Sequence, residues 1–168
     1  MSDALLRASE VAAIDTRDIA REKDGGRLTI QRSKTDQEAE GAVTYLTPAT
    51  MTALDNWLCA AAAAWTSSGP YEGPAFRRVT RSGAVSGHAP LTTNAVRAIV
   101  RKRAAAVGVE GASGHSCRVG SAQSLIERGA STAAVAIAGR WKDPGMVVRY
   151  AKAQEAGRGA VRRYFGGK

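Results

Sequence analysis

The sequence contains only two cysteines among its 168 residues, Cys59 and Cys117. They lie far apart and follow no metal-ligand spacing. The sequence also lacks a secretory signal, and the apolar run from Cys59 to Trp65 is too short to cross a bilayer. These absences favour a reduced cytoplasmic setting, at or near the nucleoid, and no association with a membrane.

Acidic residues are also few, with 15 Asp and Glu against 24 Lys and Arg. The formal charge of +9 and the pI near 10.2 favour a polyanionic partner, although a ribosome-associated protein would have the same totals. No group of carboxylates suits two-metal catalysis, and no Gly-x-x-x-x-Gly-Lys-Ser/Thr loop for a nucleotide is present. We therefore expect no metal and no cofactor. The length predicts a single domain spanning residues 1–168.

The stretch with the most distinctive chemistry runs from Gly114 to Tyr150 and begins with His115 and Arg118. Apolar residues at three- and four-residue spacing over 122–126 predict a helix that begins near Ser116. His115 then lies at the start of this helix and Arg118 one turn along the same face, so both can contact one ligand. A helix N-terminus and an arginine fork both suit a phosphate. The alternative is that His115 caps the helix and Arg118 is a surface cation.

An indole and a phenol follow on two short elements, Trp141 after a small packed helix and Tyr150 at the end of the next helix. The segment 142–145 separates the two elements, because it contains Pro and Gly. In the first of these two helices, the residues expected to face the core are Ala133, Val135 and Ile137. Tyr150 could equally be a core residue. Taken together, the histidine, arginine, indole and phenol suit attack on a phosphodiester.

The first residues predict an apolar helix face that surrounds a charged pair, Arg7 and Glu10. Residues three apart on a helix can meet on one side, so we expect these two side chains to contact each other. This pair is either part of a functional site or an ordinary ion pair on the surface. The apolar positions are Leu5, Leu6, Val11, Ala12 and Ile14.

Alternating residues predict a three-stranded antiparallel meander over Ile19–Glu22, 27–32 and Ala42–Leu46, with a first turn at 24–26. Lys34 lies at the tip between the second and third strands. A lysine in such a polar loop is ordinarily just solvated.

Two further helices are expected, the first from Pro48 to about Trp65. The Gly-, Pro- and Ser-rich region 67–90 then contains a short segment, 75–77, that is either a strand or a buried anchor, and a solvated His88. Thr92 or Thr93 caps the second helix. Its expected inward residues are Ala95, Ile99, Ala106 and Val107, and its expected outward residues are Arg97, Arg101, Lys102 and Arg103. The basic face is either solvated or in contact with a phosphate backbone.

This combination of motifs resembles the tyrosine recombinase (phage integrase) family over nearly the whole chain. The matching segments, in chain order, are Leu5-Leu6-Arg7-Ala8-Ser9-Glu10, Asp15 to Ile19, Ser33-Lys34-Thr35, His115 with Arg118, Trp141, and Tyr150 nine residues further on. The usual glycine before Leu-Arg is Ala4 here. The chain also begins only a few residues before Arg7, whereas family members normally have further helices and a DNA-clamping domain upstream.

The resemblance implies an α+β, mainly helical catalytic domain with a small three-stranded antiparallel sheet. It also implies site-specific recombination by metal-free cleavage and rejoining of DNA through a 3′-phosphotyrosine. The implied roles are phosphate ligands for Arg7 and Arg118, a supporting carboxylate for Glu10, general acid/base for His115, general acid for Lys34, hydrogen-bond donor for Trp141 and nucleophile for Tyr150.

The implied partners are double-stranded DNA, contacted by the basic residues at 97 and 101–103, and other protomers, contacted through a last helix over about 154–164. That helix could instead fold back on its own core. Two other functions remain open: a type IB topoisomerase activity, and a DNA-binding remnant or regulator that no longer cleaves.

Overall fold

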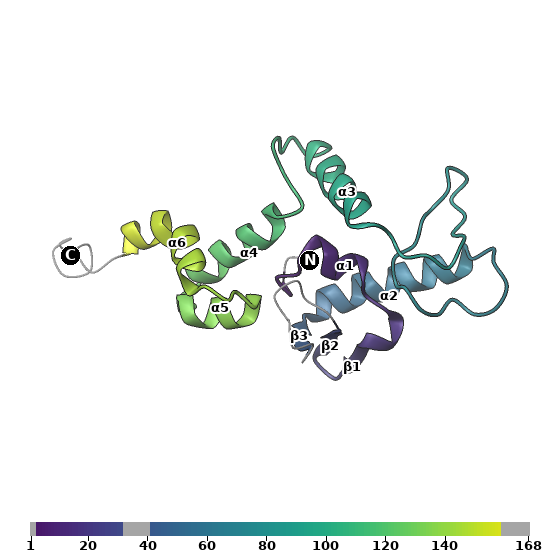
Figure 1. Cartoon of the computed structure of the whole chain (residues 1–168), viewed down its shortest axis with the longest axis horizontal. Coiled ribbons are helices and arrows are strands. Elements are labelled where there is room, and N and C mark those ends of the chain that lie inside the picture. Colours follow the sequence, from purple (N-terminus) through teal and green to yellow (C-terminus); the bar gives the residue numbers. More distant parts are fainter. Residues whose placement is uncertain (1–2, 32–40, 159–168) are drawn as a thin grey trace.

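The computed structural model describes residues 3–31 and 41–158. Its elements fall into an N-terminal half, residues 3–105, and a C-terminal half, residues 115–158, which lie side by side (Figure 1). The elements of the N-terminal half are α1 (Ala8–Ala12), a 3-10 turn (Thr16–Asp18), β1 (Ile19–Glu22), β2 (Gly25–Ile30), β3 (Ala42–Leu46), α2 (Pro48–Ala63) and α3 (Thr93–Ala105). Those of the C-terminal half are α4 (Ser116–Glu127), α5 (Thr132–Gly139) and α6 (Pro144–Arg158).

The expected three-stranded antiparallel sheet is confirmed, with strand order β1-β2-β3. Leu28 and Ile30 are buried while Thr29 between them is exposed, as the period of a strand requires. The first turn differs from the expectation, because Gly25 and Gly26 already pair with β1 and the turn lies at 23–24. Gly25 has a φ of 131°, a conformation that suits glycine and explains why the chain turns there.

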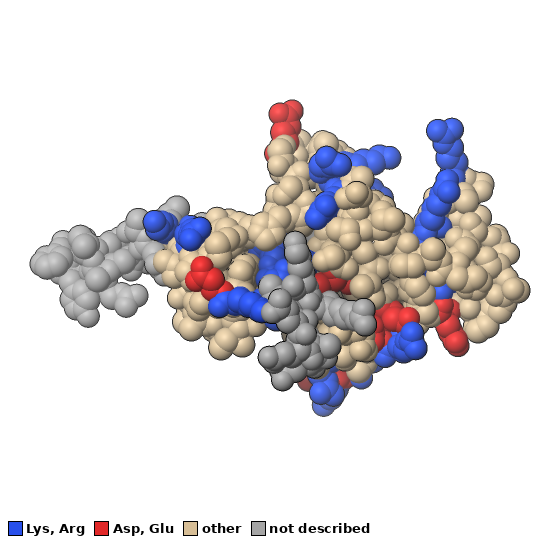
Figure 2. All heavy atoms as spheres, in the orientation of Figure 1, with Lys and Arg blue, Asp and Glu red and all other residues tan. Residues whose placement is uncertain are grey.

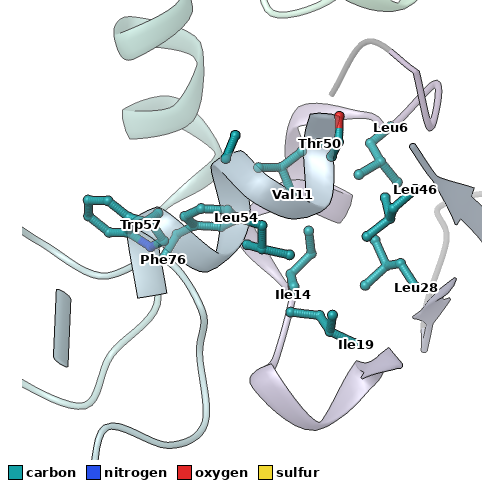
Figure 3. A pocket seen from close by; sticks show the side chains of 11 residues that line it. Leu6, Val11, Ile14, Ile19, Leu28, Leu46, Thr50, Leu54, Trp57 and Phe76 are labelled. Carbon is teal, nitrogen blue, oxygen red and sulfur yellow. The ribbon is translucent and has the colours of Figure 1, made fainter. Parts of the chain in front are cut away.

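Helix α2 covers the sheet and begins as expected, with Thr47 capping it and Pro48 in its first turn. It ends at Ala63, slightly before the expected end near Trp65. A pocket of about 270 Å³ lies between the sheet, α1 and α2 (Figure 3). It is lined mostly by apolar side chains that include Leu6, Ile14, Leu28, Leu46, Leu54 and Phe76.

The long connection from α2 to α3 is fixed by buried residues rather than by a strand. Ala75 is fully buried and its carbonyl accepts a hydrogen bond from Trp57 Nε1 at 2.8 Å. The guanidinium of the buried Arg77 lies 4.5 Å from the ring centroids of both Trp65 and Tyr71. The segment 75–77 is therefore the buried anchor, which was one of the two expectations for it.

Helix α3 begins at the expected cap, since Thr92 Oγ1 accepts a hydrogen bond from Ala95 N at 3.1 Å. Its expected inward face is mostly wrong. Ala95 is half-buried, but Ala106 is exposed, Ile99 is 48% exposed and Val107 75% exposed. The reason is that α3 packs on α1, which is only five residues long. Val96 is the one fully buried residue of α3, and it packs against Ala8 and Ala12 of α1.

The basic residues of α3 are all exposed, as expected (Figure 2 shows Lys and Arg atoms gathered over α3). They are Arg97, Arg101, Lys102 and Arg103.

The C-terminal half packs three helices around small apolar residues. The buried residues of this core include Ala122, Ile126, Val135, Ala136, Val147 and Ala151. In α5 the expected inward residues are only partly right: Val135 is buried, but Ala133 is exposed and Ile137 is 79% exposed. An eight-residue helix that packs on one side turns Val135, Ala136 and Gly139 inward instead.

Helix α6 runs without a break from Pro144 past Tyr150 to Arg158, so it begins slightly before the expected start at Met146 and continues beyond Tyr150, as its sequence allows. The residues of the expected last helix beyond Arg158 lie outside the described residues. Within the described ranges, no helix is both long and apolar enough to span a bilayer.

Candidate active site

The candidate site lies where the first residues of the chain meet the C-terminal half. Leu5 packs into the core of α4, α5 and α6 and is only 1% exposed. It adopts a left-handed conformation with φ 50°, which is uncommon for leucine, and α1 begins only after Arg7. The helix expected around Arg7 and Glu10 is therefore shorter than the apolar pattern suggested. Arg7 lies at its N-cap.

Arg7 and Glu10 form the expected pair, with Arg7 Nη1 donating to Glu10 Oε1 at 2.7 Å. The Arg7 backbone N–H also donates to Glu10 Oε2 at 2.8 Å, so the carboxylate satisfies a backbone donor at the start of α1. Glu10 Oε2 also accepts a hydrogen bond from Arg140 Nη2 at 2.9 Å, which makes a second ion pair. Burial alone would raise the pKa of Glu10, but these hydrogen bonds and the charges of Arg140 and Arg7 outweigh it and hold the pKa below its ordinary value.

The guanidinium of Arg118 is buried at the centre of the site, with 1% of the residue exposed. Its Nη1 donates to the Leu5 carbonyl and its Nη2 to the Gly139 carbonyl, while Nε has no partner among the described residues. The Trp141 ring covers it, with the ring centroid 4.0 Å from Arg118 Cζ. Burial, with the nearby charge of Arg7, lowers the pKa of Arg118 to about 10. Arg118 thus stays cationic at neutral pH and is not the surface cation of the alternative interpretation.

His115 and Tyr150 meet at the edge of this cluster, with His115 Nε2 lying 3.3 Å from Tyr150 Oη. The ring of Tyr150 also lies near that of Trp141, at 6.1 Å between centroids. Tyr150 is half-buried rather than a fully buried core residue, and Gln123 Nε2 donates to its carbonyl at 3.3 Å. A phenol hydroxyl and an imidazole nitrogen at this separation can exchange a proton once a ligand draws them together.

The ring of His115 projects from the start of α4 and makes no capping hydrogen bond to that helix. Burial, followed by the positive charges of Arg118 and Arg7, lowers the pKa of His115 below its ordinary value of 6.5. The ring is therefore neutral at pH 7, and one of its nitrogens is free of a proton. This state suits a base that accepts the proton of Tyr150.

The structure brings together six of the residues expected in the site. They are Arg7, Glu10, His115, Arg118, Trp141 and Tyr150. Lys34 lies in the connection between β2 and β3, outside the described residues. On α3, Arg97 packs against Gly114, the residue before His115: a Cβ added to Gly114 would lie 2.7 Å from Arg97 Cγ.

Arg140 also belongs to the cluster, although it was not among the expected site residues. It ends α5 in a left-handed conformation, φ 57° and ψ 44°, where glycine or asparagine is usual. The sequence feature that could have drawn attention to it is its place directly before Trp141, in the segment Gly139-Arg140-Trp141.

Known proteins resemble this chain over most of its length. Residues 1–156 match the family described as the Phage integrase family. The chain is 30% identical to the recombinase Cre of Escherichia phage P1 over 179 aligned positions, which cover 96% of this chain and 49% of that protein.

Two solved structures show the same fold. The XerA recombinase has a TM-score of 0.69 at 12% identity, covering 94% of this chain and 54% of that one. The XerH site-specific recombinase, bound to a palindromic difH substrate after cleavage, has a TM-score of 0.68 at 15% identity, covering 96% of this chain and 43% of that one. The chain therefore spans about half the length of these relatives.

Proposed function

Since the chain belongs to the phage integrase family, we propose that it cleaves and rejoins DNA in site-specific recombination, with Tyr150 as the nucleophile. The observation that carries this proposal is the position of Tyr150 Oη, 3.3 Å from a neutral His115 and beside the cationic Arg118. A phenol that has a base at its oxygen and cations at its side is prepared to attack an anion.

In the proposed reaction, Tyr150 Oη attacks the phosphorus of a DNA phosphodiester. The phenolic proton passes to His115 Nε2, a phosphorus–oxygen bond to tyrosine forms, and the bond to the 5′ oxygen breaks. Lys34 gives the departing oxygen its proton. The 3′-phosphotyrosine keeps the energy of the broken bond, so a 5′ hydroxyl can reverse the steps and rejoin a strand without ATP.

Arg7 and Arg118 neutralise the charge that grows on the phosphoryl oxygens in the transition state. Arg118 reaches them only if Trp141 moves off its guanidinium, since the indole now covers it. An indole that swings aside brings its own N–H, a donor that cannot shuttle protons, toward the same phosphate. Binding of DNA and uncovering of Arg118 are thus one event in this proposal.

The surroundings supply the remaining contacts. The exposed cations of α3, at 97 and 101–103, hold the phosphate backbone of double-stranded DNA, and the XerH relative is itself bound to its DNA substrate. The region of the last helix joins neighbouring protomers on the DNA. The reaction takes place in the cytoplasm, at the nucleoid, where the DNA lies.

A nicked suicide substrate, on which the cleaved end diffuses away, tests the proposal on a denaturing gel. The wild-type chain should form a covalent DNA adduct, and Tyr150→Phe should form none while it binds DNA nearly as well. Tyr164 is the other tyrosine near the end of the sequence. An adduct that persists in Tyr150→Phe and disappears in Tyr164→Phe would show that Tyr164 is the nucleophile. The absence of any adduct would favour the interpretation that the chain is a DNA-binding remnant that no longer cleaves. Relaxation of supercoiled DNA without sequence preference would favour a topoisomerase.

A further inference from the structure

Arg140 has a backbone conformation that glycine adopts more easily than arginine. It terminates α5 with φ 57°, in the left-handed region that a side chain disfavours. An arginine in this conformation needs a compensating contact of its side chain. The guanidinium makes that contact across the junction between the two halves of the molecule.

Glu10 is the partner and is shared by two arginines, one from each half. Arg140 Nη2 reaches Glu10 Oε2 at 2.9 Å, and Arg7 Nη1 reaches Glu10 Oε1 at 2.7 Å. The carboxylate is buried, with 1% of its side chain exposed, so both ion pairs are shielded from solvent screening. Arg140 also holds Arg7 directly, because its carbonyl accepts a hydrogen bond from Arg7 Nη2 at 3.4 Å.

We propose that Arg140 is a positioning residue for DNA cleavage: from the C-terminal half it fixes Glu10, and through Glu10 it orients the Arg7 guanidinium toward the scissile phosphate. This inference rests on the proposed function. An arginine that is oriented before the reaction loses little freedom in the transition state, whereas a misplacement of about 1 Å can cost about 100-fold in rate.

The contacts of Arg140 favour this role over a direct contact to DNA. Its Nη2 is held by Glu10 and its Nη1 by the Ala138 carbonyl at 3.2 Å. Its Nε is buried and has no partner among the described residues, and only 14% of its side chain is exposed. The guanidinium therefore faces the protein rather than the solvent from which DNA approaches.

The backbone conformation of Arg140 allows a variant that removes its side chain without disturbing the fold. Arg140→Gly removes the guanidinium and places the residue that prefers φ 57° at that position, so the fold should be kept. Single-turnover cleavage at saturating DNA should slow by about 10- to 100-fold, with DNA affinity within about twofold of wild type. Arg140→Lys, which keeps a cation, should recover part of the rate. Arg128→Gly, which removes an exposed arginine at the end of α4, is the matched control and should cleave at the wild-type rate.

A second readout is independent of cleavage. By NMR, Arg140→Gly should raise the pKa of Glu10 and broaden or shift the Arg7 side-chain Nε–H signal, and Arg128→Gly should change neither. If the wild-type chain forms no adduct but these signals move, the proposed function fails and the contact through Glu10 stands. If Arg140→Gly weakens DNA binding at an unchanged rate, or slows cleavage no more than Arg128→Gly does, the positioning role is overturned.

Discussion

The two halves of the molecule contribute to the site in different ways. The N-terminal half builds its core between a sheet and α2 and, within the described residues, contributes the side chains of Arg7 and Glu10 to the site from its edge. The C-terminal half packs three helices closely and supplies His115, Arg118, Trp141 and Tyr150. In the proposed reaction, the proton-transfer pair of His115 and Tyr150 thus lies within one packing unit, whereas the two phosphate-binding arginines, Arg7 and Arg118, come from different halves. Cleavage should therefore be far more sensitive to changes in the C-terminal half than to changes on the surface of the N-terminal half.

Loss of Arg118 should have the largest effect of the substitutions that leave the nucleophile in place. Arg118→Ala removes a cation that acts on the transition state and should slow cleavage by about 1,000-fold, while Lys102→Ala, an exposed change on α3, should cost at most a few-fold. Single-turnover rates measure both. Arg118 also donates to the Leu5 and Gly139 carbonyls, so its loss could slow cleavage by destabilising the fold. Thermal melts of each variant measure that loss of stability, and Arg118→Lys keeps a cation at the position. Equal losses at positions 118 and 102 would reduce the site to a general basic patch.

Trp141 should matter less, because it covers Arg118 and gives one hydrogen bond in the proposed reaction. Trp141→Phe keeps an aromatic cover but removes the indole N–H, and cleavage should slow by about tenfold. Burst experiments at saturating DNA measure the rate of the chemical step. Trp57→Phe is the matched control, since Trp57 Nε1 donates to the Ala75 carbonyl in the N-terminal half and should affect stability only. A wild-type rate in Trp141→Phe would mean that the indole acts only as a cover.

The smallest effect concerns pH. The pKa of His115 lies below 6.5 because of burial and the charges of Arg118 and Arg7, so the fall in cleavage rate on acidification, as the base becomes protonated, should be centred below pH 6.5. A depressed pKa in the folded state also means that His115 contributes stability above pH 6.5, which is lost as the pH falls through the folded value. Cleavage rates and thermal melts across this range measure the two effects. An acid limb centred above pH 6.5 would contradict the assignment.

The sequence predicted the parts of the site that depend on local geometry. His115 and Arg118 follow from helical spacing at the start of α4, and the pair of Arg7 and Glu10 from a separation of three residues. The sheet follows from alternation and from the position of its glycines. In each case the structure is decided within a few neighbouring residues.

The features that were missed depend on contacts between distant segments. Ile99 was expected to face inward, but the short α1 leaves room only for Val96, and nothing near α3 in the sequence indicates that length. Arg118 is buried under Trp141 because α4 and the end of α5 come together, and Arg140 meets Glu10 across 130 residues of chain. Spacing within a helix carries no information about these approaches.

Mapping the covalent bond to one residue tests the central claim most directly. After reaction with the nicked suicide substrate and digestion by trypsin, cleavage at Arg149 and Lys152 releases Tyr150 in a peptide of residues 150–152, well separated in mass from the peptide 164–168 that contains Tyr164. We predict that mass spectrometry finds the nucleotide remnant on the 150–152 peptide. A remnant on the 164–168 peptide or on any other tyrosine would contradict the account.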